Sequence, residues 1–284
     1  MSDPGAAAQP GIAPTARRTA GTMLAALYGE LVPHSWRDPE SEHDAYQLFH
    51  QRSLAMGWLD DRASIAEEHA PEKRMIVAPG LWAMNDAGWN HPLADPASRL
   101  ISWFQVEASA VVGDRPLPVQ PFLHCAEDTT KQIGAVRLTA VQVLLPVQGI
   151  DVSARPPYAM VPSAQTSDWF SERDPRSRPT VKVRIDTGRD PSVPVVALQL
   201  AHSLSVLDQN VFVGGPDERV LPGSFPVPPF DDRLWNGPPL HGMTLSGELA
   251  EWSCDAVGWL AEAVADSAAR LGIHTPLLLT VAQA

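Results

Sequence analysis

The segment VKVRIDT at residues 181–187 decides how the C-terminal part of the chain folds. Its apolar residues alternate with polar ones, which is the period of a strand with one buried face. The stretch GMTLSGELA at 242–250 alternates in the same way, and LLLTV at 277–281 is a short apolar run. Each of these three stretches therefore predicts a β-strand.

Helical patterns separate the predicted strands. Residues 192–208 follow a proline suited to an opening turn and are apolar nearly all round, which predicts a well-buried helix. Between 257 and 271 apolar residues recur at helical spacing, with Ser253 as N-cap and Gly272 as C-terminal cap residue. With a short strand at 210–213, the order of elements predicts a split β-α-β module of the ferredoxin-like kind over 180–284.

The N-terminal half is expected to repeat part of this order. The patterns predict helices at 18–32 and 42–57, a short strand at 74–78, and long strands at 100–112 and 135–147 with a short helix between them. The predicted fold is α+β, with two tandem ferredoxin-like halves whose antiparallel sheets are joined edge to edge or face to face. No identity of side chains supports this duplication, which rests on element order alone.

Proline marks the boundaries between the predicted parts. The chain has 28 prolines and is rich in them at 154–179 and 214–240, where the missing amide proton favours loops over strands and helices. We therefore expect a flexible tail at 1–16, an α+β half at 17–150, a proline-rich linker at 151–179 and a ferredoxin-like half at 180–284. The 214–240 loop is too long for a simple connection, and such loops are usually functional.

Composition excludes several classes of protein. A net charge of −12 disfavours binding to nucleic-acid phosphates and to anionic membrane surfaces, and no stretch has the length and apolarity of a membrane span. The two cysteines, Cys125 and Cys254, cannot form a disulfide framework and are expected to be buried thiols. The prediction is a cytoplasmic protein without HExxH, CxxC or GxGxxG motifs, and the sequence indicates no metal and names no cofactor.

The segment LWAMNDAGWNHPLADP at 81–96 is one candidate for a ligand pocket. Indole rings beside amide and carboxylate groups line many small-molecule sites, whereas in a plainer interpretation the indoles fill the core. In an enzyme, His91 or Asp86 would be the acid–base group. The predicted pocket walls are Trp82, Asn85, Trp89 and Asn90.

The polar side of the predicted sheet is a second candidate. The strands that begin at 181 and 242 are expected to be central neighbours, which places Lys182, Arg184 and Glu248 on the face away from the helices. Lys182 and Arg184 would then anchor a small anion or carboxylate. The alternative is a solvated face whose charges pair across strands.

Two hypotheses of function remain open. Phe225, Phe230 and Trp235 place large apolar rings among the prolines of the 214–240 loop, which is typical of a partner surface. The first hypothesis is a non-catalytic module that self-associates as a homo-oligomer or joins a larger cytoplasmic assembly. The alternative is a small-molecule enzyme, an isomerase, lyase or hydrolase, with a Trp/His/Asp-lined pocket between the halves. The first is favoured because the chain contains no compact catalytic motif.

Overall fold

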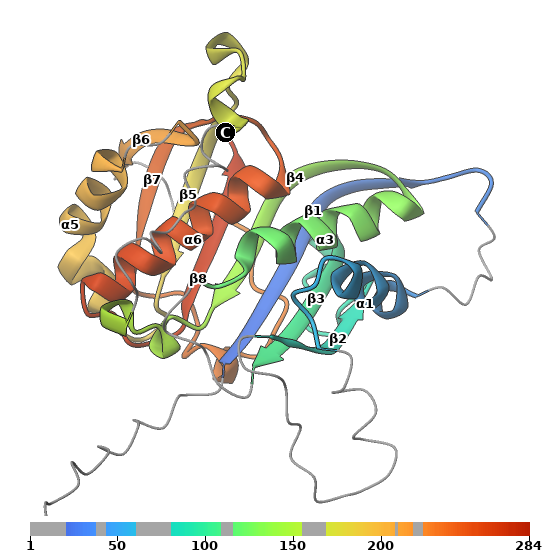
Figure 1. Ribbon diagram of the computed structural model, residues 1–284, viewed down its shortest axis with the longest axis horizontal. Helices are drawn as coiled ribbons and strands as arrows, with labels where there is room; N and C mark the ends of the chain where they lie inside the picture. Colours follow the sequence, from blue (N-terminus) through green and yellow to red (C-terminus); the bar gives the residue numbers. More distant parts are fainter. Residues whose placement is uncertain are drawn as a thin grey trace, which may run out of the picture.

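The computed structural model describes residues 21–37, 44–60, 81–108, 116–154, 169–207, 210–217 and 224–284. The fold is α+β, and the described strands form one eight-stranded antiparallel sheet in the order β2-β3-β1-β4-β8-β5-β7-β6 (Figure 1). The strands are β1 Gly21–Pro33, β2 Ala83–Gly88, β3 Leu100–Ala108, β4 Gly134–Leu145, β5 Thr180–Asp186, β6 Phe212–Pro216, β7 Gly242–Leu249 and β8 Leu277–Gln283.

Four α-helices are described, namely α1 Ala45–Ala55, α3 Val119–Ile133, α5 Ser192–Val206 and α6 Cys254–Arg270. The side chain of Asp44 caps α1 by accepting from the Gln47 amide, and Ser253 caps α6 in the predicted way. Helices α3 and α6 pack against each other across the middle of the sheet (Figure 1). Short 3₁₀ turns lie at Pro96–Ser98, Val147–Gly149, Val152–Ala154, Pro175–Ser177 and Asp232–Leu234.

The sheet is continuous across the two halves of the chain. Strand β4 of the first half pairs with β8 of the second, and Val141 lies opposite Val281. Of the two arrangements expected for the sheets, face-to-face joining is wrong, because the strands of both halves are joined edge to edge in a single sheet. The chain order strand–helix–strand–strand–helix–strand occurs once from β1 to β4 and again from β5 to β8.

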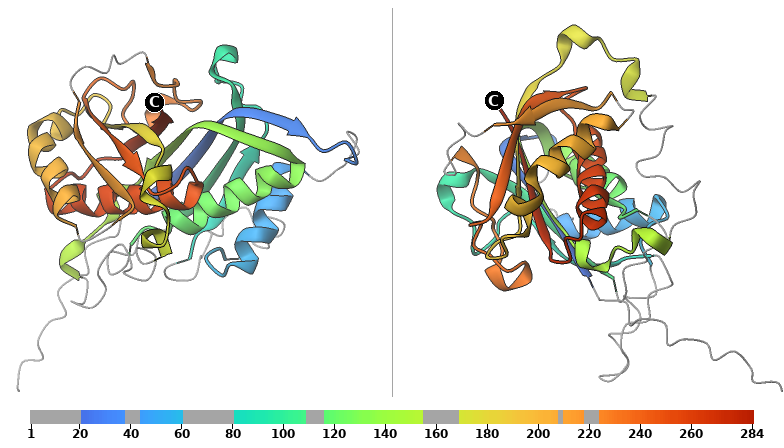
Figure 2. Two further views of the ribbon diagram at one scale, coloured as in Figure 1. Left: turned by 90° about the horizontal axis from the view of Figure 1, so that it is seen from above. Right: turned by 90° about the vertical axis from the view of Figure 1, so that its left-hand side faces the viewer.

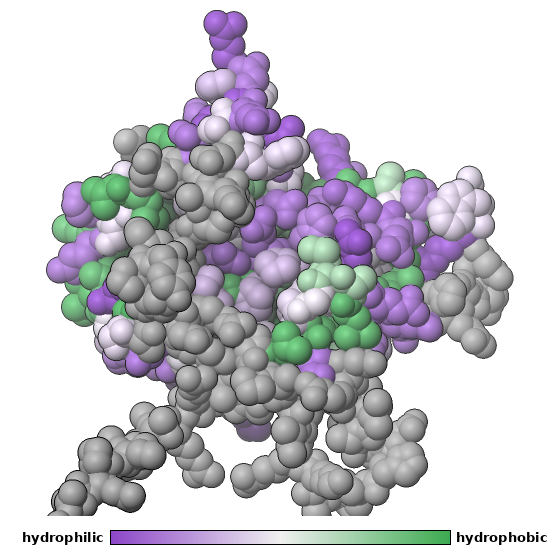
Figure 3. All heavy atoms as spheres, viewed as in Figure 1, coloured by the Kyte–Doolittle hydropathy of each residue, from purple (hydrophilic) through white to green (hydrophobic). Residues whose placement is uncertain are grey.

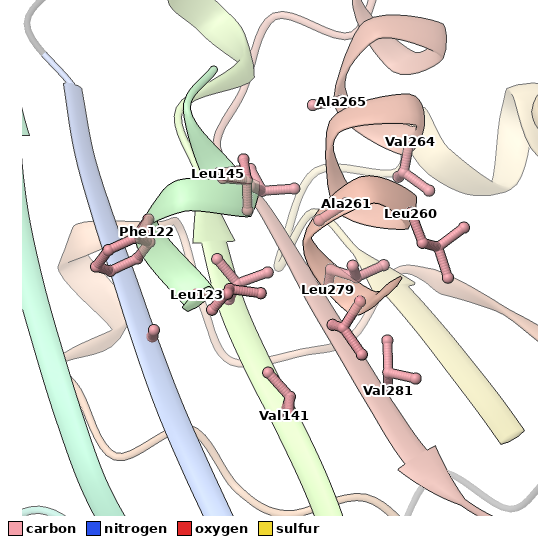
Figure 4. Close-up of a cluster of buried hydrophobic side chains, with 14 of the residues drawn as sticks. Phe122, Leu123, Val141, Leu145, Leu260, Ala261, Val264, Ala265, Leu279 and Val281 are labelled. Atoms are coloured by element: carbon pink, nitrogen blue, oxygen red, sulfur yellow. The ribbon is translucent and has the colours of Figure 1, made fainter. Parts of the chain in front are cut away.

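The main core fills the space between this sheet and the helices. Leu123 of α3 and Leu260 of α6 lie over alternate residues of β4 and β8, such as Val141 and Leu279 (Figure 4). The residues between these point to the opposite face, where Leu144 and Leu278 contact the 224–240 loop. We call this side of the sheet, which carries no helix among the described residues, the open face. The proline-rich loop packs on it, on the side away from α6 (Figure 2, right).

The helix predicted at 18–32 is wrong, because this segment forms strand β1. It lies between β3 and β4, and every residue from Met23 to Tyr28 is buried, whichever face its side chain is on. A strand covered on both faces gives a continuous apolar run, in which helical spacing appears by chance. The helix at 42–57 and the short helix between the strands at 100–112 and 135–147 are confirmed as α1 and α3.

The predicted burial of the helix at 192–208 is also wrong. Helix α5 inserts Val193, Leu200 and Leu204 into the core, but the outer side chains of Val195 and Leu198 are 78% and 79% exposed. The helix lies at one end of the sheet, where it packs against β6, β7 and, among the described helices, α6. Its outer side is therefore exposed in the described part of the chain. The strand predicted at 74–78 and the tail at 1–16 fall outside those residues. None of the helices in the described part has the length and apolarity to cross a membrane.

Candidate functional site

The outer side of α5 exposes three aliphatic side chains, Val195, Leu198 and Val206, which we call the α5 face. The polar residues Gln199, His202 and Ser205 are exposed beside them. Leu198 and Val206 follow Val195 by three and eleven positions, so the three residues lie on one side of the helix. Figure 3 shows hydrophobic residues gathered over α5 at the left of the view. No charged residue occurs anywhere in Ser192–Val206, and β6 beside it is the terminal strand of the sheet.

Helix α1 provides an internal comparison for this surface. It follows the first strand of its half and packs against α3, as α5 follows β5 and packs against α6. The exposed residues of α1 include Gln47 and Gln51, whereas α5 exposes Val195, Leu198 and Val206 in addition to Gln199 and His202. An aliphatic outer side is therefore not a requirement of a helix in this position.

A cavity of about 420 Å³, which we call the helix pocket, lies where α3 meets α6. Apolar side chains form most of its wall, and the imidazole of His124 and the carboxylate of Asp255 are its charged or titratable groups. Since α3 and α6 come from different halves of the chain, the pocket lies between the halves. The lining residues are Met56, Gln120, Pro121, His124, Trp169, Phe170 and Asp255.

His124 is held from both sides of its ring. Its Nδ1 lies 3.0 Å from Oδ1 of Asp255, and its Nε2 lies 3.3 Å from Oδ2 of Asp128. Arg52 donates from Nη2 to the same Asp128 oxygen at 2.6 Å and lies 3.4 Å from His124 Nε2. Because a carboxylate can only accept, Nδ1 carries the proton in the bond to Asp255. The cluster connects α1, α3 and α6 and fixes one imidazole orientation beside the pocket.

Sequence reasoning missed this pair because His124 and Asp255 are 131 positions apart. Only the packing of α3 on α6 brings them together, so no local motif records the contact. The neighbouring Cys125 is buried and free, and burial raises the pKa of its thiol. Within the described residues no group of three or more His, Cys, Asp or Glu side chains is arranged to hold a metal ion.

The predicted pocket at 81–96 is spread over several environments. Trp82 belongs to the main core and forms a bridge with Leu59. Asn85, on the terminal strand β2, donates to the Glu107 carboxylate. Trp89 is partly buried against the core, and the carbonyl of Asn90 accepts from the indole of Trp103 at 2.9 Å.

The two predicted acid–base groups make contacts of their own. The exposed carboxylate of Asp86 accepts from the amide of Ala87. The ring of His91 meets Trp103 edge-on at 4.7 Å between centroids, and its Nδ1 accepts from the Leu93 amide. Partial burial lowers the pKa of His91, although the Asp86 charge opposes this. Neither residue lines the helix pocket, and a role in ligand binding stays a prediction.

The polar face of the second half is more informative. Strands β5 and β7 are adjacent as predicted, and Arg184 lies opposite Thr244. The Nη2 of Arg184 donates to Oδ2 of Asp186 at 2.7 Å, with side chains 13% and 1% exposed. Glu248 lies opposite Thr180 at the far end of β5, so it is not beside Arg184. Lys182 shares the face with Arg184 but does not line the cavity there.

The three aromatic residues of the proline-rich loop differ from the expectation of exposed rings. Trp235 is fully buried, and both it and Phe230 pack against Leu24, Leu144 and Leu278 on the open face. Phe225 is partly exposed and lines the cavity that contains Arg184. Phe230 and Trp235 therefore hold the loop on the sheet. Because prolines cannot donate backbone hydrogen bonds, burial of apolar area is the main interaction that keeps the loop in place.

The cavity beneath this loop, which we call the loop pocket, brings Arg184 and Phe225 together. It has a volume of about 230 Å³ and lies between the sheet and residues 225–228 and 239. The structure thus presents three candidate features, namely the α5 face, the helix pocket and the loop pocket. No protein-family model, curated protein or solved structure matches the chain, so their roles are argued from geometry alone.

Proposed function

We propose that the protein is a non-catalytic α+β module that self-associates through the α5 face. The observation that carries this proposal is the exposure of Val195, Leu198 and Val206 on one side of a helix. Exposed aliphatic side chains favour association, since burying them removes apolar area from water. Membership of a larger cytoplasmic assembly and a lack of binding to nucleic acid stay predictions from composition.

The partner that we propose for the α5 face is a second copy of the chain, because this surface lacks the negative charge of the rest of the protein. Each chain carries a net charge of −12, so two copies repel one another over most of their surface. The segment Ser192–Val206 contains no charged residue and is a place where two copies can meet without burying like charges. The adjacent edge of β6 would extend the contact, because terminal strands have unpaired backbone groups.

We further propose that the two halves are tandem ferredoxin-like units. Read outward from the junction, the strand orders are β4-β1-β3-β2 and β8-β5-β7-β6, which are the same order within each half. Both halves also share one order of strands and helices along the chain. A duplicated and fused unit explains why β4 and β8 meet in the middle and why α3 packs beside α6.

Substitution of Leu198 by glutamate is expected to dissociate the assembly. The wild-type protein should be a dimer in native mass spectrometry, and Leu198→Glu should be a monomer at the same concentration. A carboxylate at this position would be desolvated in the dimer without a partner, a cost of several kcal/mol. The melting temperature of the monomer should hardly change, because the Leu198 side chain is 79% exposed.

Gln51→Glu on α1 is the matched control, because it adds the same charge to an exposed helical position of the other half. This variant should remain a dimer. A monomeric wild-type protein, or a Leu198→Glu variant that stays dimeric, contradicts the proposal.

A second candidate function is small-molecule chemistry in the helix pocket, favoured by the His124–Asp255 pair at its wall. This supports the alternative of a Trp/His/Asp-lined pocket between the halves, although its residues differ from those named from the sequence. Asp255 orients the ring, as the carboxylate partner of a general-base histidine does. Apolar contacts to Trp169 and Phe170 would hold the hydrocarbon part of a substrate.

This candidate is tested by comparing two histidines. The purified protein is incubated with a mixture of small metabolites, and their depletion is followed by mass spectrometry. The rate of depletion of any metabolite should fall by at least about 100-fold in His124→Gln. Loss of a general base typically lowers a rate by about 10²- to 10⁴-fold. His91→Gln should keep the wild-type rate. Equal rates for wild type and His124→Gln, or no depletion by the wild type, would reject catalysis at His124.

A further inference from the structure

The loop pocket is built on three adjacent strands. Gln142 of β4 lies opposite Thr280 of β8, and Thr280 lies opposite Arg184 of β5, so the three side chains form one row across the sheet. Leu278, two positions before Thr280, adds an apolar surface beside this row. The row crosses the junction between the halves, and the loop closes over it.

The hydrogen bonds of this row leave donors unused. Gln142 donates to Thr280 Oγ1 at 2.9 Å and to the carbonyl of Pro226 at 3.3 Å, while its Oε1 accepts from Tyr28. The Thr280 hydroxyl proton, having no acceptor in the described part, is then available to a ligand. Gln142 itself is fully engaged.

Arg184 also has unused donors. Its Nη2 donates to Asp186 and to the carbonyl of Pro239, at 2.7 and 3.2 Å. Its Nε and Nη1 have no acceptor among the described residues, although the side chain is only 13% exposed. Both Asp186 oxygens already accept hydrogen bonds, from Arg184 and from the Gly188 amide. This side of the pocket therefore presents hydrogen-bond donors to a ligand.

We propose that the loop pocket binds a small monocarboxylate, whose oxygens accept from Arg184 and Thr280 and whose hydrocarbon part lies against Phe225, Pro228 and Leu278. Asp186 is a positioning residue that holds the guanidinium in place. A volume of about 230 Å³ admits roughly seven water-sized volumes of about 30 Å³ each. This favours an acid with about seven non-hydrogen atoms, such as 3-methylbutanoate.

Charge limits the ligand to a single carboxylate. Arg184 is already paired with Asp186, and the carbonyls of Pro226 and Pro239 add partial negative charge nearby. A phosphate or dicarboxylate would bury two negative charges against one guanidinium, which desolvation disfavours. Burial raises the pKa of the Asp186 carboxyl, although the Arg184 guanidinium opposes this.

The test is isothermal titration calorimetry with 3-methylbutanoate, its neutral analogue 3-methylbutanamide, and four forms of the protein. Arg184→Gln alone would leave Asp186 buried without its partner, so the double variant Arg184→Gln/Asp186→Asn is used, with circular dichroism to verify folding. Affinity for the acid should fall at least tenfold in the double variant and severalfold in Thr280→Val, because charge-assisted bonds are worth more than neutral ones. Lys182→Gln, on the same strand and face but outside the pocket, should bind as the wild type does.

Saturable binding with this pattern supports the proposal. Absence of binding to folded wild type at millimolar concentration, unchanged affinity in the double variant, or equal affinity for the amide overturns it. None of these results depends on the oligomeric state, so the test is independent of the α5 face.

Discussion

Trp235→Ala lowers the free energy of unfolding by about 3 kcal/mol in our expectation, one of the two largest effects predicted for a single residue. Trp235 is fully buried on the open face and contacts both Leu144 of β4 and Leu278 of β8. Truncating a buried tryptophan typically costs about 3–5 kcal/mol, and the lower end applies because its indole N–H has no partner among the described residues. Thermal denaturation should show a midpoint about 10 °C below that of the wild type.

Leu234→Ala is the matched control, since Leu234 is adjacent in sequence but exposed. It should change the free energy by less than about 1 kcal/mol. The comparison separates two roles for the loop. If Trp235 binds a partner and does not hold the loop to the sheet, Trp235→Ala will weaken an assembly and leave the melting of the monomer unchanged. A wild-type melting temperature for this variant would therefore contradict the packing described here.

The second half of the fold was predictable because its local signals agree with one another. Residues 181–187 alternate, Ser253 and Gly272 mark the limits of a helix, and both patterns became β5 and α6 as expected. Strand β1 was not predictable in the same way, because it is buried on both faces and therefore lacks alternation. The exposure of α5 could not be inferred either, since an aliphatic outer side looks the same in sequence whether it faces a core or a partner.

The candidate sites were predictable only where one strand carries them. Arg184 was identified because alternation in β5 places it on the polar face, and Phe225 because it stands among prolines. Their meeting in one pocket depends on the path of the loop over the sheet, which no local pattern specifies. His124 and Asp255 come from helices in different halves, so only the packing of α3 on α6 reveals the pair.

Gly258→Val tests the contact between α6 of the second half and α3 of the first half. A Cβ at residue 258 of α6 would lie 2.6 Å from Cα of Gln120 in α3, a distance at which the two helices must separate. We expect a loss of about 3 kcal/mol in the free energy of unfolding, measured by urea denaturation, because overpacking against backbone cannot be relieved by a side-chain rotation. Helix propensity alone predicts a small gain, since valine is more favourable than glycine inside a helix.

Gly215→Val in β6 supplies the comparison for the same change of residue. A Cβ at residue 215 meets no atom within 4 Å, and valine suits a strand, so this variant should be neutral or slightly stabilised. A loss at 258 together with no loss at 215 locates the cost at the contact of α3 with α6. If Gly258→Val is as stable as the wild type, the helices do not approach this closely. The shared core over β4 and β8, on which both the helix pocket and the single sheet depend, would then need a different arrangement.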